Sequence, residues 1–261
     1  MIAIRSEREI DILREANQIV AKVHQHLASL IVPGITTREL DYEAEKIILE
    51  HEGVPAFKGY RGFPAATCIS LEEEVVHGIP GERKLKDGEI VSIDVGVCYR
   101  GYYGDAARST QCGTQDAKRQ KLLRTTDLAL ARAVRATKAG NFLQDIGRAV
   151  ENTCKPMSYG VVRDFVGHGI GTSMHEEPQI LNFDSGERGA LLREGMVLAI
   201  EPMVNMGTHK VKVLKDGWTA VTRDGKPSVH FEHSVVVRPE GGEILSFSEE
   251  CPWGAIPEDT A

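Results

Sequence analysis

An internal repeat constrains the fold of this 261-residue chain more than any other feature. Residues 85–94 (LKDGEIVSID) match residues 192–201 (LREGMVLAIE), 107 positions further on. The helix-breaking triplet at 33–35 (PGI) is matched by the triplet at 139–141 (AGN) at nearly the same offset. Two matches in the same order at nearly one offset predict a duplicated structural unit.

Both copies show the order helix, break, helix, loop, strands. Capping boxes and apolar residues at helical spacing predict helices over 6–30 and 36–53, and the second copy predicts helices over about 115–137 and 143–155. A strand is expected at 67–70, a hairpin at 90–109, and strands with loops from 161 onward. We therefore expect an α+β fold in one domain, residues 1–261, with pseudosymmetric halves of about 1–115 and 116–261. A ligand site is expected between the halves.

Composition excludes several classes of protein. The net charge is −7 and no Lys/Arg cluster occurs, which argues against a nucleic-acid-binding face. No apolar run approaches the length of a membrane span, and the N-terminus has no signal-peptide pattern, so a cytoplasmic location is expected. The five scattered cysteines predict free thiols and neither disulfides nor a structural zinc site.

Two aspartates stand out in the predicted hairpin. Asp94 interrupts an apolar strand, and Asp105 lies in the return strand. A tight turn centred between Tyr99 and Arg100, beside Gly101, would place the two carboxylates directly opposite each other. Facing carboxylates need a shared proton or a cation. The alternative is a register one residue off, with one aspartate facing solvent.

The second copy carries two further carboxylates on apolar strands. Glu201 occupies the place of Asp94, and Glu232 begins another apolar run. The midpoint between them falls in Asp216-Gly217, a dipeptide typical of type I′ hairpin turns, although exact pairing of Glu201 with Glu232 stays open. Four carboxylates would be neutralised by two divalent cations.

Several histidines are candidates for neutral metal ligands or for contacts with a substrate. His168 lies in the glycine-rich segment 167–171 and resembles His77 in its local sequence, although the different offset requires an insertion or deletion. His175 and His77 are candidates for hydrogen bonding to a substrate or for proton transfer. His230 is a weaker candidate. Carboxylates with one or two imidazoles suit Mn²⁺, Fe²⁺, Co²⁺ or Zn²⁺, and two such ions about 3.5–4 Å apart support hydrolysis.

Taken together, nine short motifs resemble those of type I methionine aminopeptidases over nearly the whole chain. They are 59–64 (GYRGFP), 68–70 (CIS), 75–80 (VVHGIP), Asp94 with 104–105 (GD), 167–171 (GHGIG), 175–178 (HEEP), 200–204 (IEPMV), 215–218 (KDGW) and 231–233 (FEH). The resemblance implies the pita-bread fold. It also implies removal of the initiator methionine from nascent chains when the second residue is small.

The same resemblance implies roles for individual residues. Two divalent ions would be held by Asp94, Asp105, His168, Glu201 and Glu232, of which Asp105 and Glu232 bridge the ions. A bridging hydroxide would attack the scissile carbonyl, with Glu201 as general base and proton shuttle. His175 would stabilise the developing oxyanion, and His77 would contact the scissile amide nitrogen. The substrate would be bound by Tyr60, Phe63, Cys68, His77, His175 and Trp218.

Three positions depart from the family pattern. The family commonly has Asn where Glu72 stands, in a loop whose backbone carbonyls hold a sodium or potassium ion, so Glu72 puts that ion in doubt. Met174 replaces an aromatic residue, and His230 replaces a glutamine and adds a nitrogen near the metal site. The chain begins directly at the catalytic region, so it resembles the short bacterial or organellar form, with a monomer acting near the ribosome as the family expectation.

Two other classes remain as alternatives. One is another pita-bread hydrolase, such as a proline-directed aminopeptidase or dipeptidase, which usually carries an additional N-terminal domain. The other is a non-enzymatic binding module on the same fold, which would lack metal ligands and carry basic patches. Because fold alone does not separate these classes, the site residues must do so.

Overall fold

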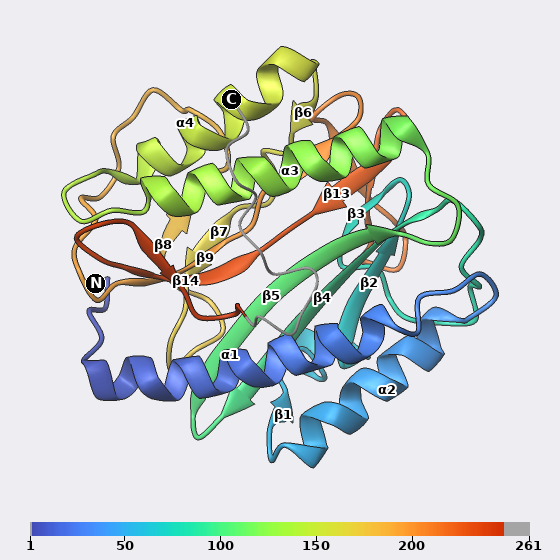
Figure 1. The fold of residues 1–261 in the computed structure, drawn as a ribbon, viewed down its shortest axis with the longest axis horizontal. Coiled ribbons are helices and arrows are strands. Elements are labelled where there is room, and N and C mark those ends of the chain that lie inside the picture. The colour runs from blue at the N-terminus through green and yellow to red at the C-terminus, as the bar shows by residue number, and fades with distance from the viewer. Residues whose placement is uncertain (1, 248–261) are drawn as a thin grey trace.

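The computed structural model describes residues 2–247, so Cys251 lies outside the described residues. Two helix pairs flank a set of antiparallel strands (Figure 1). Helices α1 (Glu7–Ala28) and α2 (Thr37–Glu50) lie on one side, and α3 (Ala117–Ala136) and α4 (Leu143–Cys154) lie on the other. Within residues 2–247, no helix combines the length and the apolar character that a membrane span requires.

The helix starts follow the capping residues seen in the sequence. The backbone N–H of Ser6 donates to the Glu9 carboxylate over 2.9 Å, and the backbone N–H of Glu39 donates to Thr36 Oγ1 over 3.1 Å. At α3, the Asp116 carboxylate accepts from the backbone N–H groups of the second and third helical residues. These contacts satisfy N–H groups that have no partner within the helix. Each predicted helix is found, with ends within three residues of the expected ones.

In the first half, β4 (Ile90–Tyr99) lies between β2 (Thr67–Leu71) and β5 (Tyr102–Gln111), and β1 (Val54–Pro55) also pairs with it. The β4–β5 turn is Arg100-Gly101, with φ angles of 49° and 80°, as a type I′ turn requires. Asp94 therefore pairs with Ala107, and Asp105 pairs with Gly96. The predicted direct opposition of the two aspartates is wrong, because the turn is centred one residue later. Both still share one face of the sheet, since their positions differ by two residues along the ladder.

In the second half, the strand order β7–β9–β14 repeats the order β2–β4–β5. These strands are β7 (Gly167–Gly169), β9 (Val197–Ile200) and β14 (His233–Val237), extended outward by β8 (Glu176–Ile180) and β15 (Gly242–Ile244). The repeat therefore reflects a structural duplication. The proposed match of His77 with His168 is wrong: His168 lies in β7, the counterpart of β2, whereas His77 follows β3 (Glu74–Val76).

One long, interrupted hairpin runs through the second half. After β9 and β14, the same two chain segments pair again as β10 (Met203–Asn205) with β13 (Ser228–His230), and then as β11 (Val211–Val213) with β12 (Ala220–Thr222). Ile200 pairs with His233, and Met203 pairs with His230. Two residues separate these pairs on each side, so Glu201 lies opposite Glu232. The tip is the loop 214–219, in which Asp216 accepts from two backbone N–H groups, and it is longer than the type I′ turn that the Asp-Gly signal predicts.

Four apolar clusters of the described residues hold the strands and helices together, the smallest of them around Val75, Met203 and Val211. One lies between α1, α2 and the first-half strands, and a second lies between α3, α4 and the second-half strands. The third lies between the halves and includes Phe57, Phe63, Cys68 and Met174. Short elements complete the fold: the 3₁₀ turns Tyr60–Gly62 and Lys155–Met157, and β6 (Gly160–Val161), which pairs with β10. The third cluster places apolar side chains beside the strand carboxylates.

Candidate active site

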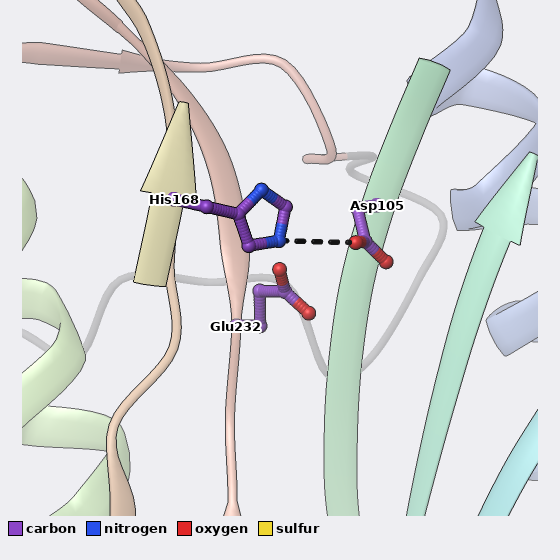
Figure 2. Close-up of side chains that lie close together, drawn as sticks. All are labelled: Asp105, His168 and Glu232. Atoms are coloured by element: carbon purple, nitrogen blue, oxygen red, sulfur yellow. Dashed lines mark ion pairs between the residues drawn. The ribbon is translucent and has the colours of Figure 1, made fainter. Parts of the chain in front are cut away.

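Three buried side chains from separate strand segments converge between the two halves. Figure 2 shows Asp105 of β5, His168 of β7 and Glu232, just before β14, pointing toward one another. One ligand atom from each lies within 4.8 Å of those of the other two. Their exposed fractions are 4%, 7% and 2%, so water contributes little to their solvation. This arrangement is suited to a cation.

Glu201 and Asp94 extend this cluster. His168 Nε2 lies 3.5 Å from Glu201 Oε1 and 3.8 Å from Asp105 Oδ2. Asp94 lies on the same sheet face as Asp105 and lines the same pocket. All five side chains that the sequence analysis named as metal ligands are therefore brought together.

The carboxylates repel one another in a poorly solvated site. Burial raises the pKa of Asp94 to about 7. Burial and the neighbouring carboxylates Asp94 and Glu201 raise the pKa of Asp105 well above its usual range. The pKa values of Glu201 and Glu232 are also raised well above their usual range, first by burial and then by neighbouring carboxylates. Without a cation, protons must relieve this repulsion.

His168 presents one nitrogen to the carboxylates. Its Nδ1 lies 3.0 Å from the Gly169 carbonyl oxygen, which can only accept a hydrogen bond, so Nδ1 carries the proton. The lone pair of Nε2 then faces Asp105 and Glu201. Burial lowers the pKa of His168 to about 4, which keeps the ring neutral near pH 7. A neutral imidazole fixed in this tautomer is a ready metal ligand.

Several polar atoms of this cluster have no partner within residues 2–247. Asp94 Oδ1, Asp105 Oδ1 and Glu232 Oε1 are buried without a hydrogen bond. Orphaned buried carboxylate oxygens are expensive, and a divalent cation bound here would satisfy them. The residues present therefore fit a divalent metal ion.

The cluster forms the floor of a pocket of about 160 Å³. Phe63 and Trp218 meet edge to face with ring centroids 5.1 Å apart, and His77 lies 6.4 Å from Trp218. Cys68 pairs with Asp94 across β2 and β4, so it lies between the apolar wall and the floor. The pocket thus joins an aromatic and sulfur-containing wall to a group of metal-binding side chains.

His175 lies at the edge of this pocket. Its ring centroid is 4.3 Å from that of His168, and its Nδ1 lies 3.0 Å from the Tyr60 hydroxyl. Partial burial and the nearby charge of Arg61 lower the pKa of His175. Every residue to which the resemblance assigned a metal-binding, catalytic or substrate-binding role lines this one pocket, whereas the weaker candidate His230 is not among its lining residues.

Two further residues line the pocket without having been named as site residues. Arg61 lies inside the quoted motif at 59–64. The sequence therefore showed its place in the chain, but not that it lines the pocket. Phe57 precedes that motif and reaches the pocket through the chain path from β1 into the 3₁₀ turn Tyr60–Gly62.

The residues that depart from the family pattern have specific surroundings. The Glu72 carboxylate accepts from Arg119 Nε over 3.0 Å, from Arg119 Nη2 over 2.9 Å and from the backbone N–H of Ile90 over 2.8 Å. Its negative charge is therefore compensated. Met174 is buried in the cluster between the halves, and His230 Nε2 lies 3.8 Å from Glu201 Oε2. None of the three displaces a residue of the metal-binding group.

A shared group of buried carboxylates and one neutral imidazole, on the floor of a pocket, is typical of metal-dependent hydrolases. The comparisons with known proteins agree with this class. The model of metallopeptidase family M24 matches residues 11–239. The chain is 48% identical to the methionine aminopeptidase of Clostridium perfringens over 246 residues. These aligned residues make up 94% of this chain and 99% of that protein.

Solved structures give the same result. The crystal structure of methionine aminopeptidase from Thermotoga maritima matches with a TM-score of 0.92 and 43% identity, over 94% of this chain and 99% of that one. The prolidase from Pyrococcus furiosus shares the fold with a TM-score of 0.74 and 24% identity, over 94% of this chain and 66% of that one. The chain belongs to metallopeptidase family M24 and, within it, to the methionine aminopeptidases. It therefore has the pita-bread fold expected from the sequence.

Proposed function

We propose that this protein removes the N-terminal methionine from peptides and nascent proteins whose second residue is small. The observation that carries the proposal is the junction of two surfaces in one pocket. Aromatic rings and the Cys68 thiol offer the contacts that a methionine thioether prefers. The metal-binding side chains lie directly beside them, where the peptide bond after that methionine would be placed.

The metal centre that we propose comprises two divalent ions of Co, Mn, Fe or Zn. Asp94, Asp105, His168, Glu201 and Glu232 would hold the ions, with Asp105 and Glu232 shared between them. When bound, such ions polarise a carbonyl and supply an activated water at neutral pH. The four carboxylates balance the charge of two divalent ions.

Three side chains are proposed to act on the substrate. Glu201 is the general base and proton shuttle, because its side chain lines the pocket and is 13% exposed, more than Asp105 or His168. With the Tyr60 hydroxyl as donor to Nδ1, His175 carries its proton on Nε2 and can donate it to the carbonyl oxygen as negative charge develops there. His77, whose burial lowers its pKa to about 4, is neutral and contacts the scissile amide nitrogen.

We propose further that the catalytic unit is a single domain that acts as a cytoplasmic monomer close to the ribosome. A sodium or potassium ion near Glu72 is compatible with this proposal, because Arg119 already compensates the Glu72 charge. The proline-directed alternative is disfavoured, because the likeness to prolidase supports the fold alone, whereas the methionine aminopeptidase of Clostridium perfringens is 48% identical to this chain.

A panel of peptides tests the function. We expect release of methionine from Met-Ala peptides, weak release from Met-Lys peptides, and little reaction with Leu-Ala or X-Pro peptides. Chelator-treated protein should be inactive, and added Mn²⁺ or Co²⁺ should restore activity. Preference for X-Pro peptides over Met-Ala peptides would refute the proposal.

Two variants test the residue roles. Glu201→Gln and Asp94→Ala should each lower kcat/KM for a Met-Ala peptide by at least about 100-fold, the scale on which general-base groups contribute. Glu50→Gln, which removes the same charge at the exposed end of α2, serves as the control and should retain full activity. Near-normal activity of Glu201→Gln would remove Glu201 from the mechanism.

A further inference from the structure

The 3₁₀ turn Tyr60–Gly62 holds an arginine in an unusual backbone conformation. Arg61 has φ 49° and ψ 23°, in the left-handed region that non-glycine residues seldom adopt. Gly59 and Gly62 on either side also have positive φ, at 84° and 91°. Such a conformation persists only where the surroundings impose it, and it is common at functional sites. Here it brings Arg61 to the lining of the pocket.

The Arg61 guanidinium rests on an aromatic ring and has no carboxylate partner among the residues that the structure describes. Its Cζ lies 5.3 Å from the centroid of the Tyr60 ring, within the range of a cation–π contact. Within residues 2–247, no ion pair to Arg61 is formed, whereas Arg5, Arg119 and Arg238 each form at least two. The Arg61 residue is exposed. The positive charge of Arg61 is therefore accessible to a ligand.

Arg61 also lies on the substrate side of the site. The Tyr60 ring that carries it stacks on His175, with centroids 5.3 Å apart, and the Tyr60 hydroxyl contacts His175 Nδ1. The Arg61 charge is felt at His175, since it contributes to the lowered pKa of that imidazole. Under the proposed function, His175 donates a hydrogen bond to the carbonyl oxygen of the cleaved bond. A substrate chain that leaves the pocket on the His175 side passes Tyr60 and Arg61.

We propose that Arg61 is a specificity residue that favours substrates with Asp or Glu shortly after the second residue and disfavours Lys or Arg there. The inference rests on the proposed function and adds a preference beyond the methionine pocket. The chemistry is that of a guanidinium, which binds carboxylates through paired N–H donors and repels cations. Extended chain advances about 3.3 Å per residue, so the inferred contact with the exposed Arg61 side chain is assigned to the third and fourth substrate residues, which follow the small second residue.

The protein as a whole does not provide this preference. Its net charge is −7, so the average field repels acidic peptides. A preference for acidic substrates must therefore come from a local cation at the mouth of the pocket. Such a preference should weaken as salt screens the exposed charge.

Peptide pairs that differ only in charge provide the test. Met-Ala-Asp-Gly-Trp-amide and Met-Ala-Lys-Gly-Trp-amide are compared with Met-Ala-Gly-Gly-Trp-amide, and kcat/KM is measured at low and high salt. The wild-type protein should favour the Asp peptide over the Lys peptide by about 3- to 10-fold at low salt, the scale of an exposed charge pair. The preference should reside mainly in KM.

Variants of Arg61 isolate its contribution. Arg61→Asn removes the charge with a residue that tolerates the left-handed conformation, Arg61→Asp reverses the charge, and Arg61→Lys retains it. The ratio between the Asp and Lys peptides should fall to about 1 in Arg61→Asn, invert in Arg61→Asp, and persist in part in Arg61→Lys. Arg124→Gln, which removes an exposed charge from α3, is the matched control and should keep the wild-type ratio.

The outcomes separate this inference from the proposed function. Cleavage of all three peptides with the same Asp/Lys ratio in wild type and Arg61→Asn overturns the role of Arg61 and leaves the aminopeptidase activity standing. Failure of the wild-type protein to cleave even the uncharged peptide, with divalent metal present, overturns the proposed function and this inference with it. Because the readout is a ratio within each variant, a general loss of activity does not obscure it.

Discussion

Metal-free protein should become less stable as pH rises, because four carboxylates share a buried site. Asp94 shows why the stability should fall, and not rise, with increasing pH. Its pKa is raised by burial from an ordinary 3.8 to about 7, so the folded protein binds a proton more tightly than the unfolded chain does. Stability from this group is fully present below pH 3.8 and is lost as pH rises through about 7. Asp94→Asn should remove this dependence, since the amide cannot ionise.

The magnitude follows from the pKa of Asp94. The rise to about 7 corresponds to about 4 kcal/mol of unfolding free energy at pH 8, at about 1.4 kcal/mol per pKa unit. About half of that loss falls between pH 5.5 and pH 8. Urea unfolding in the presence of chelator should therefore show that the wild-type protein loses about 2 kcal/mol more over this interval than Asp94→Asn does.

Added metal should stabilise the wild-type protein more than Asp94→Asn. With Mn²⁺ or Co²⁺ at pH 8, the wild-type protein should gain stability because its carboxylates bind the ions, whereas Asp94→Asn should gain less. Glu50→Gln removes an equal charge at the exposed end of α2, so it should follow the wild-type curves. Parallel pH curves for wild type and Asp94→Asn in chelator would show that the reasoning about the buried carboxylates is wrong.

Three further predictions concern the scaffold. Gly104→Ala should destabilise the protein by about 1–3 kcal/mol, since the added Cβ would lie 2.8 Å from the backbone carbon of Ala16 in α1; urea unfolding measures this, and an unchanged midpoint would contradict the packing. Asp116→Ala should lower the free energy of unfolding by about 1 kcal/mol, because it removes the N-cap of α3. Asp116→Asn should lower it much less. Arg119→Gln should cost about 1–3 kcal/mol because it leaves the Glu72 carboxylate uncompensated, and the added change Glu72→Asn should restore most of the loss. Equal stability of the single and double variants would refute that pairing.

Much of the fold could be predicted because local signals and the repeat agreed. Capping residues such as Ser6 and Thr36 predicted helix starts, since a short-range hydrogen bond decides them. The match of Asp94 with Glu201 predicted equivalent strands, and β4 and β9 do hold equivalent places. In contrast, the β4–β5 turn was predicted one residue too early, which shifts the strand pairing by two residues, from Asp94 with Asp105 to Asp94 with Ala107. The sequence pattern put Gly101 beside the centre of the turn, whereas the type I′ turn needs positive φ at both Arg100 and Gly101.

The candidate site could be predicted as a set of residues, but not in its geometry. Glu201 and Glu232 show the difference: their midpoint was visible in the sequence, but only the paired segments β10–β13 and β11–β12 carry the register across the irregular chain between them. Arg119 and Glu72 are 47 residues apart, and no local pattern joins them. The direction of Arg61 depends on a left-handed backbone that tertiary contacts impose, so propensity could not reveal it.

The long hairpin from β9 to β14 carries metal-binding side chains at its base and a side chain of the pocket wall at its tip. Glu201 and Glu232 lie at the base, whereas Trp218 lies in the tip loop 214–219 and meets Phe63 in the pocket wall. A one-residue insertion in either arm would turn a carboxylate to the opposite face and destroy the metal-binding floor. The same insertion in the tip loop would reshape the wall and leave the floor in register. Substrate choice and hydrolytic chemistry can therefore diverge separately on a single hairpin.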